Sequence, residues 1–406
     1  MRKTFVLFVC VVSFTTRVAY SQTQSNPLGQ DRTFNPITTS VPFLLIGPDS
    51  RIGGMGETGA AILDDANAQH WNPAKYLFAQ KDVGISLSYS PWLAGLNIHD
   101  IHLLYLSTYY KVTTMDAISF SLRYFSMGKM DITDYAGTVI MTAQPHEFAI
   151  DGAYSRVLVE NLSMAVTGRF IYSHLSNYSV TQDIKAGMSG AADISLFYTK
   201  KFRPKNLYNH NLNVGLNISN IGAKISYSST MKRDFLPANF RFGLAYEMWI
   251  DKYNKFTLAA DANKLLVTSP PVYQLDDIGQ IVYENGEPVI AKGRNPYQTP
   301  APVAVFTSWF DAPNGFKEEM QEYILNFGLE YAYNNLLFIR AGYFNEAINK
   351  GNRKYITVGV GVKYSVFAID ASYIIPIYAG KTGGRSPLEN TLRFTLSFDF
   401  DVDRRK

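Results

Sequence analysis

Two glycine-containing patterns in the chain have spacings that nucleotide-binding and catalytic proteins use. Gly54-x-Gly56-x-x-Gly59 has the spacing of a dinucleotide-binding turn. It lacks a strand–helix–strand unit and the acidic residue about twenty positions on that binds the ribose, so we interpret it as a backbone turn. The run 187–191, Gly-Met-Ser-Gly-Ala, resembles the turn around a catalytic serine, but it opens a predicted strand instead of joining a strand to a helix. Neither pattern predicts an active site.

Two pairs of residues could bind a metal ion. Asp64 and Asp65 are adjacent carboxylates, and we expect a helix cap or a turn there instead of a cation site. His99 and His102 have no third ligand within reach by sequence, and they straddle the junction of a loop and a strand. The six histidines are scattered over loops, which does not indicate a catalytic triad. The sequence therefore predicts no enzyme, no metal and no cofactor.

The composition narrows the class of protein to which these residues belong. Of 406 residues, 47% are hydrophobic, 27 are Tyr and 26 are Phe, while only 18% are charged, below the roughly 25% of soluble domains. No window of about 18 consecutive apolar residues exists, which excludes a helical membrane protein. The remaining classes are a large β-rich soluble protein and an outer-membrane barrel.

The first 21 residues have the features of an export signal. Arg2 and Lys3 precede an apolar stretch, and Ala19-Tyr20-Ser21 places small residues where a signal peptidase reads them, so we expect cleavage before Gln22. Cleavage removes three of the 38 basic residues and none of the 34 acidic ones. The net charge of the mature chain is therefore 35 − 34 = +1. A nearly neutral mature chain does not indicate a nucleic-acid partner. Cleavage also removes the single cysteine, so no disulfide is expected.

After about residue 82 the chain becomes a series of segments in which apolar and polar residues alternate, as they do in half-buried strands. In 392–400, for example, Leu and Phe alternate with Arg, Thr, Ser and Asp. Counting such segments predicts fourteen strands, at 83–91, 101–110, 115–126, 146–156, 161–174, 188–200, 210–219, 238–249, 255–263, 321–332, 336–344, 354–363, 366–374 and 390–401.

The predicted connections also alternate in length. Those after strands 2, 4, 8, 10 and 12 are short, and those after strands 3, 5, 7, 9, 11 and 13 are longer, with the ninth running over 264–319. Outer-membrane barrels have short periplasmic turns and long extracellular loops. An even strand count then places both chain ends in the periplasm. The connection after strand 6, at 201–209, is longer than its rim predicts.

The polar stripe of the predicted strands carries both signs of charge, which would be costly facing lipid but can pair across a wet lumen. A soluble sandwich would fit the alternation but not the strand length, the loop pattern and the aromatic content together. We therefore predict an all-β fold, a fourteen-stranded antiparallel transmembrane barrel. The charged residues expected to point inward are Arg123, Arg169, Arg241, Arg340, Lys363, Arg393, Glu147, Asp151, Asp193, Glu247, Asp261, Glu330, Asp370 and Asp399.

Residues 41–81 do not have the pattern of strands, yet their composition is too ordered for a tail. A fourteen-stranded lumen is wide enough to need a plug, so we expect this segment to fill it as a hatch. The predicted organisation is a signal peptide at 1–21, a periplasmic lead at 22–40, the hatch at 41–81, and the barrel at 82–406 with its long extracellular loop at 264–319.

Two blocks in the hatch carry a family resemblance. V-P-F-L…P-D-S-R-x-G-x-M-G-E and A-Q-H-W-N-P-A-K-Y-L-F, ahead of fourteen strands, resemble the FadL-type outer-membrane family and, more closely, its PorV-type branch. In FadL-type barrels this segment forms a hatch in the lumen. The matching hatch residues are Pro48, Asp49, Arg51, Met55, Gly56, Asp64, Asp65, Trp71, Asn72, Pro73, Ala74 and Lys75.

The resemblance implies a role in the type IX secretion system, without catalysis. PorV-type proteins dock to a large SprA-type translocon barrel and accept cargo that carries a C-terminal secretion domain. They deliver it to a PorU-type sortase, which attaches the cargo to lipopolysaccharide or the cell surface. The long loop could provide the protein-contact surface, through Pro270, Pro271, Tyr273, Tyr297, Trp309 and Phe310; it could instead be a lid over the lumen.

A second function, from another class, is passive transport of fatty acids or other hydrophobic small molecules. It predicts a continuous apolar pocket between hatch and wall that opens sideways, whereas the secretion role predicts a plugged lumen and exposed loops. A third possibility, a link to lipopolysaccharide deacylation, has no residues in the sequence to support it.

Overall fold

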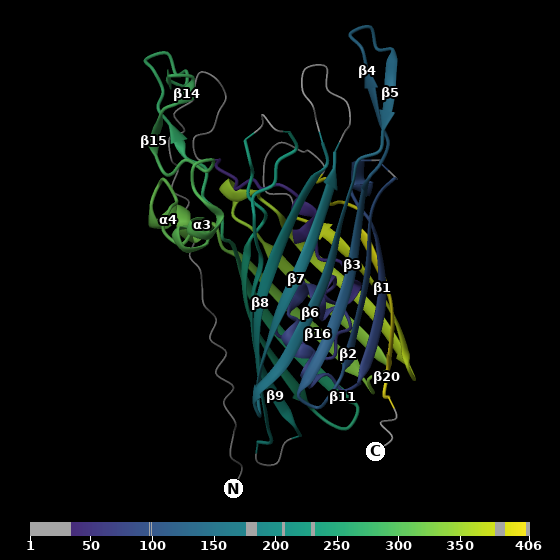
Figure 1. Cartoon of the computed structure of the whole chain (residues 1–406). Coiled ribbons are helices and arrows are strands. Elements are labelled where there is room, and N and C mark those ends of the chain that lie inside the picture. Colours follow the sequence, from purple (N-terminus) through teal and green to yellow (C-terminus); the bar gives the residue numbers. More distant parts are fainter. Residues whose placement is uncertain are drawn as a thin grey trace.

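The computed structural model describes residues 34–402, except 97, 99, 176–184, 205–207, 229–231 and 378–385. Fourteen antiparallel strands form a closed barrel (Figure 1). They are β1 (Val83–Pro91), β2 (Ile101–Lys111), β3 (Asp116–Met127), β6 (His146–Val159), β7 (Leu162–His174), β8 (Gly187–Phe202), β9 (His210–Gly222), β10 (Asn239–Trp249), β11 (Asn254–Leu265), β16 (Ile324–Tyr333), β17 (Leu337–Asn345), β18 (Lys354–Tyr364), β19 (Phe367–Pro376) and β20 (Leu392–Phe400).

The predicted strands are confirmed, each with ends that differ by at most three residues. β1 pairs with β20 from Val83 opposite Phe400 to Tyr89 opposite Phe394, and this pairing closes the sheet. Closure leaves no edge strand. The backbone N–H and C=O groups of each strand therefore pair with those of its two neighbours in the wall. A soluble sandwich, which would have left edges, is thereby excluded.

The two faces of the wall differ as the alternation predicts. Ile85, Leu87 and Tyr89 of β1 are exposed on the outside, while Ser86 and Ser88 between them are buried. The charged residues expected to point inward, such as Arg169 and Arg340, are buried in the lumen, except Lys363 and Asp399, which are half-buried. An apolar outer band around a polar interior is the arrangement of an outer-membrane barrel.

The two rims differ in the length of their connections. One rim has short turns, among them 160–161, 334–336 and 365–366, and the connection 203–209 is its long exception. Asn334 and Asn335 have φ of 53° and 51°, the left-handed backbone that a two-residue hairpin turn requires.

The opposite rim carries the long connections (Figure 1). One contains a hairpin of β4 (Met130–Thr133) and β5 (Val139–Ala143). The longest, between β11 and β16, contains β12 (Val272–Tyr273), β13 (Tyr283–Glu284), β14 (Glu287–Pro288), β15 (Ile290–Lys292), α3 (Ala301–Thr307) and α4 (Phe316–Gln321).

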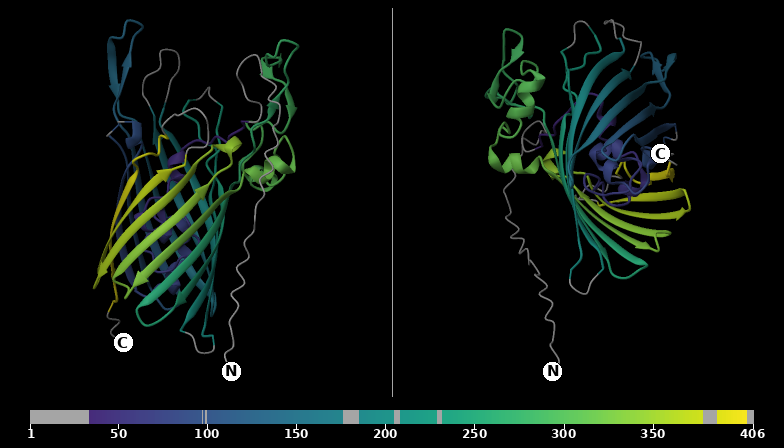
Figure 2. Two further views of the ribbon diagram at one scale, coloured as in Figure 1. Left: turned by 180° about the vertical axis from the view of Figure 1, so that it is seen from behind. Right: turned by 60° about the horizontal axis from the view of Figure 1, so that its bottom comes forward.

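Residues 41–80 lie inside the barrel, where Figure 2 shows them enclosed by the strands. Their short helices are η1 (Pro42–Leu45), α1 (Ser50–Gly53), α2 (Ala68–Trp71) and η2 (Pro73–Phe78). The side chains of Ile52, Met55 and Trp71 are completely buried. No helix among the described residues is long and apolar enough to cross a membrane.

The path of the chain into the lumen corrects one expectation. Residues 34–40, part of the predicted periplasmic lead 22–40, lie at the long-loop rim. The Asn35 backbone N–H donates to Asn349 O between β17 and β18, and the Ser40 N–H donates to Phe235 O between β9 and β10. The segment then descends through the lumen to β1. Strand parity determines only where the barrel's own strands end, not the rim from which a preceding segment enters. The predicted signal peptide at 1–21 lies outside the described residues.

Candidate functional site

The first half of the hatch is organised around a buried carboxylate. One Asp49 oxygen accepts the Ile52 N–H at 2.9 Å and so caps α1. The other accepts the indole N–H of Trp71 at 2.7 Å. Trp71 in turn lies under the Arg241 guanidinium of β10, 4.4 Å from its ring centroid. Asp49 and Trp71, 22 residues apart, therefore link α1 to α2 and to the barrel wall.

Arg51 connects the hatch to β16, two strands along the wall from β10, through a buried ionic chain. Its guanidinium donates to both oxygens of Glu330 on β16, at 3.1 and 3.0 Å, and to the Leu63 carbonyl oxygen at 3.0 Å. Glu330 also accepts from Arg340 at 2.7 Å, and Arg340 donates to Asp370 at 2.5 Å. Bidentate pairing of this kind sets position as well as charge.

At Met55 and Gly56 the hatch backbone is in direct contact with the backbone of the wall. Gly56 has φ of +68°, and a Cβ there would lie 2.7 Å from Phe327 O. On the wall side, a Cβ on Gly342 would lie 2.0 Å from Gly56 N. The glycine pattern is therefore the backbone turn that we expected, and glycine is needed on both sides of the contact.

Asn72, Pro73 and Ala74 fasten the second half of the hatch. The Asn72 amide donates to Leu196 O of β8 at 2.9 Å and to Ala60 O within the hatch at 3.1 Å. The hydroxyls of Ser155 and Ser163 on β6 and β7 donate to Pro73 O at 3.0 Å and Ala74 O at 2.7 Å. Hydrogen bonds at these three residues thus attach the hatch to three adjacent strands of the wall, β6, β7 and β8.

Lys75, Asp64 and Asp65 close the lower part of the hatch. The buried Lys75 ammonium donates to Gly59 O at 2.7 Å and lies 3.9 Å from Asp65. Asp65 accepts the Asn67 N–H at 2.9 Å, whereas Asp64 accepts from the backbone and side chain of Gln80 at 2.7 and 2.8 Å. The two carboxylates form turns, and their oxygens do not converge on one cation.

The run 187–191 and the pair His99 and His102 were the other patterns considered in the sequence. Ser189 lies within β8 and donates to Ala223 O at 2.8 Å, so it is not at a strand-to-helix turn. His102 begins β2, and His99 lies outside the described residues.

The long loop is anchored to its rim by a buried ionic cluster that the sequence did not reveal. Lys264 of β11 contacts Glu319 at 2.7 Å and Glu322 at 2.5 Å. Lys350, from the connection between β17 and β18, contacts Glu318 at 2.6 Å and Glu322 at 3.0 Å. These partners lie tens of residues apart, so sequence spacing carries no sign of them. Because both lysines are buried, the cluster positions α4 on the rim.

Two further contacts extend this anchor. The Ser269 hydroxyl lies within hydrogen-bond distance of two carboxylates, 3.0 Å from Asp311 and 2.6 Å from Glu322, and burial raises the pKa of Asp311 to about 6. The Asn35 side chain donates to Pro270 O and to Glu318, both at 3.0 Å. The entering chain is therefore bound to the base of the long loop.

The six loop residues singled out in the sequence have different environments. Trp309 packs edge-on against Phe240 of the wall, with ring centroids 5.0 Å apart, so it anchors the loop. Phe310, its neighbour, is 90% exposed. Tyr297 is exposed beneath the Lys232 ammonium. Tyr273 forms part of β12, after Pro270 and Pro271.

Phe310 is one of three strongly exposed phenylalanines of the long loop, two of which sequence reasoning missed. Phe306 of α3 and Phe316 of α4 are each 78% exposed, and Val303 and Met320 are exposed nearby in the chain. Figures 1 and 2 show α3 and α4 beside the rim, outside the circle of strands. The four-residue spacing of Phe306 and Phe310 was the available signal. We call Phe306, Phe310 and Phe316 the loop aromatic surface.

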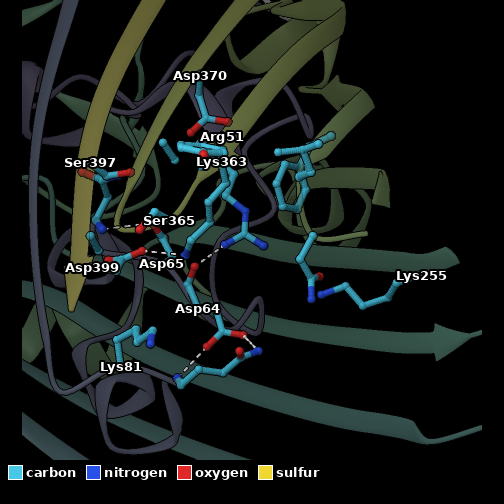
Figure 3. A pocket seen from close by; sticks show the side chains of 18 of the residues that line it. Arg51, Asp64, Asp65, Lys81, Lys255, Lys363, Ser365, Asp370, Ser397 and Asp399 are labelled. Atoms are coloured by element: carbon cyan, nitrogen blue, oxygen red, sulfur yellow. Dashed lines mark hydrogen bonds and ion pairs between the residues drawn. The ribbon is translucent and has the colours of Figure 1, made fainter. Parts of the chain in front are cut away.

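The hollows of the molecule bear on whether the barrel conducts. Where hatch and wall meet at the short-turn end, a cavity of 520 Å³ is lined largely by polar and charged residues (Figure 3). A strongly apolar hollow of 660 Å³, around Leu258, Phe327 and Leu329, is lined by wall residues alone. A third hollow, of 810 Å³, is lined jointly by hatch residues such as Leu45 and Ile46 and by wall residues such as Ile324.

The sequence profile described as "Type IX secretion system protein PorV" matches residues 29–272. That is more than half of the chain, and it includes the whole hatch. The chain belongs to the PorV family. Among curated proteins none matches it.

Several solved structures are similar to this PorV-family chain in fold. A FadL homologue of Pseudomonas aeruginosa shares 10% identity with a TM-score of 0.42, covering 90% of this chain and 99% of that one. The toluene transporter TodX of Pseudomonas putida shares 12% identity with a TM-score of 0.48, covering 88% and 98%. The toluene transporter TbuX of Ralstonia pickettii shares 11% identity with a TM-score of 0.45, covering 87% and 98%.

Family and architecture together identify the chain as a fourteen-stranded β-barrel of the PorV family, which belongs to the type IX secretion system.

Proposed function

We propose that this chain is the cargo-accepting barrel of its type IX secretion system. It would dock to an SprA-type translocon barrel, take over cargo with a C-terminal secretion domain, and pass it to a PorU-type sortase at the lipopolysaccharide-covered surface. Membership of the PorV family supports the assignment of the chain to the type IX secretion system. The observation that carries the role is the loop aromatic surface, held on a rim whose lumen is filled by the hatch.

Exposed aromatic side chains on an anchored loop are suited to binding another protein. Large apolar side chains exposed together usually mark an interaction surface, and aromatic residues supply much of the binding energy at interfaces. The ionic cluster of Lys264 and Lys350 holds the loop in place, so less conformational entropy is lost on binding. The alternative of a lid fits less well, because α3 and α4 lie beside the rim.

A mild-detergent pull-down of the tagged protein from its native outer membrane tests the role, with mass spectrometry of proteins and lipids. We expect a very large barrel protein, or exported proteins that share one C-terminal domain. Recovery of the protein alone, with stoichiometric fatty acid, would establish the transporter alternative and overturn the proposal.

A pair of variants locates the contact. Phe310→Ser should weaken capture by about 2 kcal/mol, the size of an interface hot spot. Tyr135→Ser is the matched control, because Tyr135 is a fully exposed aromatic residue in another connection of the same rim. Equal losses in both variants would show that the loop aromatic surface is not the contact.

The membrane topology remains part of the proposal. We propose that residues 1–21 are a signal peptide cleaved before Gln22, that the short-turn rim is periplasmic, and that the long loops face the cell exterior. Amino-terminal sequencing of the mature protein and proteolysis of intact cells test these three statements.

A further inference from the structure

The cavity at the short-turn end of the lumen has the features of a ligand site. It is bordered by hatch residues 64–67 and 80–81 on one side and by the inner wall on the other (Figure 3). Its volume of 520 Å³ lies within the range of about 300–1,000 Å³ that small-molecule sites occupy. Leu336, Phe338 and Tyr364 contribute apolar walls.

Almost all charged side chains around the cavity have partners. Asp65 lies near Lys75, and Asp64 accepts hydrogen bonds from Gln80 at both oxygens. The remaining ion pairs are Arg51 with Glu330, Arg340 with Glu330 and Asp370, Lys363 with Asp399, and Lys81 with Asp401. These groups are therefore committed to the hatch, the wall or each other.

Lys255 is the exception among the described residues that line the cavity. It is 7% exposed, near the start of β11, and it has neither an ion pair nor a hydrogen bond with any described residue. Its ammonium lies 5.5 Å from the Trp249 ring centroid, and no dashed line reaches it in Figure 3. An ammonium group has three donors, and no described residue accepts a hydrogen bond from this one, so its donors are available to a ligand in the cavity.

We propose that this cavity binds a singly charged oxyanion, with Lys255 as its cationic ligand. Among the described residues that line the cavity, five are cations (Arg51, Lys81, Lys255, Arg340 and Lys363) and four are carboxylates (Asp64, Asp65, Asp370 and Asp399). The lining therefore carries one surplus positive charge. One negative charge beside Lys255 would balance it, whereas a polyanion would add uncompensated negative charge.

The chemistry selects a carboxylate or a phosphate oxyanion, which can come from a free solute or from a lipid headgroup. Bound between Lys255 on the wall and Arg51 of the hatch, which also lines the cavity, the anion would add a link between the two. Binding therefore stabilises the plugged lumen. This inference does not depend on the proposed secretion role, because it is measured on the purified barrel.

The test is a titration of the full-length protein in mild detergent at pH 6 and constant ionic strength, with chloride as the balancing anion. The probes are sodium acetate, inorganic phosphate and dihexanoyl phosphatidylglycerol. Tryptophan fluorescence reports occupancy, because Trp249 lies beside Lys255, and Trp249→Phe shows whether the signal comes from that site. Saturable binding of at least one probe by the wild-type protein is expected.

Lys255→Gln should weaken that binding about ten- to a hundred-fold, the effect of losing one charged hydrogen-bonding partner. Lys252→Gln is the matched control: it makes the same charge change at an exposed position on the adjacent turn, outside the cavity lining, and should bind as the wild type does. Heat-modifiable gel migration verifies that each variant folds.

The outcomes show whether the anion is a free solute or a lipid headgroup, and whether the proposal is right. Lys255-dependent binding of acetate or phosphate supports a free solute, and Lys255-dependent binding of the lipid alone supports a headgroup. If the wild-type protein binds no probe, or if Lys255→Gln binds as tightly as Lys252→Gln, the proposal is wrong.

Discussion

Replacing Arg51 by Met should loosen the hatch without unfolding the barrel. The substitution removes two hydrogen bonds to Glu330 and one each to Leu63 O and Asp64 O, and it leaves the aliphatic bulk largely in place. Breaking a buried ion pair costs about 3–5 kcal/mol when the remaining charge has no partner. Here Glu330 keeps Arg340 at 2.7 Å, so we expect the lower limit, about 3 kcal/mol.

The barrel itself should be unaffected, because its wall is held by a closed ladder of backbone hydrogen bonds. A loss of about 3 kcal/mol corresponds to a factor of roughly 150 in the population of the undocked hatch. Hydrogen–deuterium exchange measures this population directly. Amides of residues 41–80 should exchange about a hundred-fold faster in the variant, while amides of β1 and β20 keep their protection.

The control is Arg353→Met, which removes a bidentate pair with Glu346 in a side chain that is 45% exposed. A pair of this kind contributes at most about 1 kcal/mol, so hatch exchange should change little. The reasoning is refuted if Arg51→Met leaves hatch exchange at the wild-type rate, or if the strands lose protection together with the hatch.

Three further predictions concern other contacts. Gly342→Val should displace the hatch, because a Cβ there would lie 2.0 Å from Gly56 N; planar-bilayer recordings should show new conductance, whereas Gly152→Val, where a Cβ meets no atom within 4 Å, should stay closed. Asn72→Ala should cost the hatch about 1–3 kcal/mol, since Leu196 O and Ala60 O lose their donor; an unchanged exchange rate at 60–75 would contradict this. Docking of the long loop should weaken as pH rises from about 4 through 6. Burial raises the pKa of Asp311 to about 6, so the docked loop binds this proton more tightly than the released loop and is favoured at low pH. Proteolysis at 266–323 should accelerate across that range, and Asp311→Asn should abolish the step; a step that survives in the variant would assign it to another group.

The strands and the hatch could be predicted because each depends on local patterns. Alternation has a period of two residues, so any strand of about ten residues reveals its two faces in its own sequence. The hatch could be predicted because residues 41–81 lack this alternation and because two blocks within them carry the family resemblance.

Other parts of the candidate site depended on what the closed barrel brings together. Arg51 and Glu330 are 279 residues apart, and no sequence spacing connects them. Trp309 and Phe310 have similar chemistry, yet one packs on the wall while the other is exposed, because only the docked position of the loop distinguishes them.

The amino-acid sequence by itself thus determined the strands, their inward and outward faces, the plugged lumen and the family. Only the tertiary structure decided that residues 34–40 enter at the long-loop rim, and that Lys255, at the opposite end, forms no ion pair with any described residue. The physical reason is that periodicity and turn chemistry depend on residues close together in the sequence. The rim at which the chain enters, the pairing of charges and the exposure of side chains depend on how the barrel closes around the hatch.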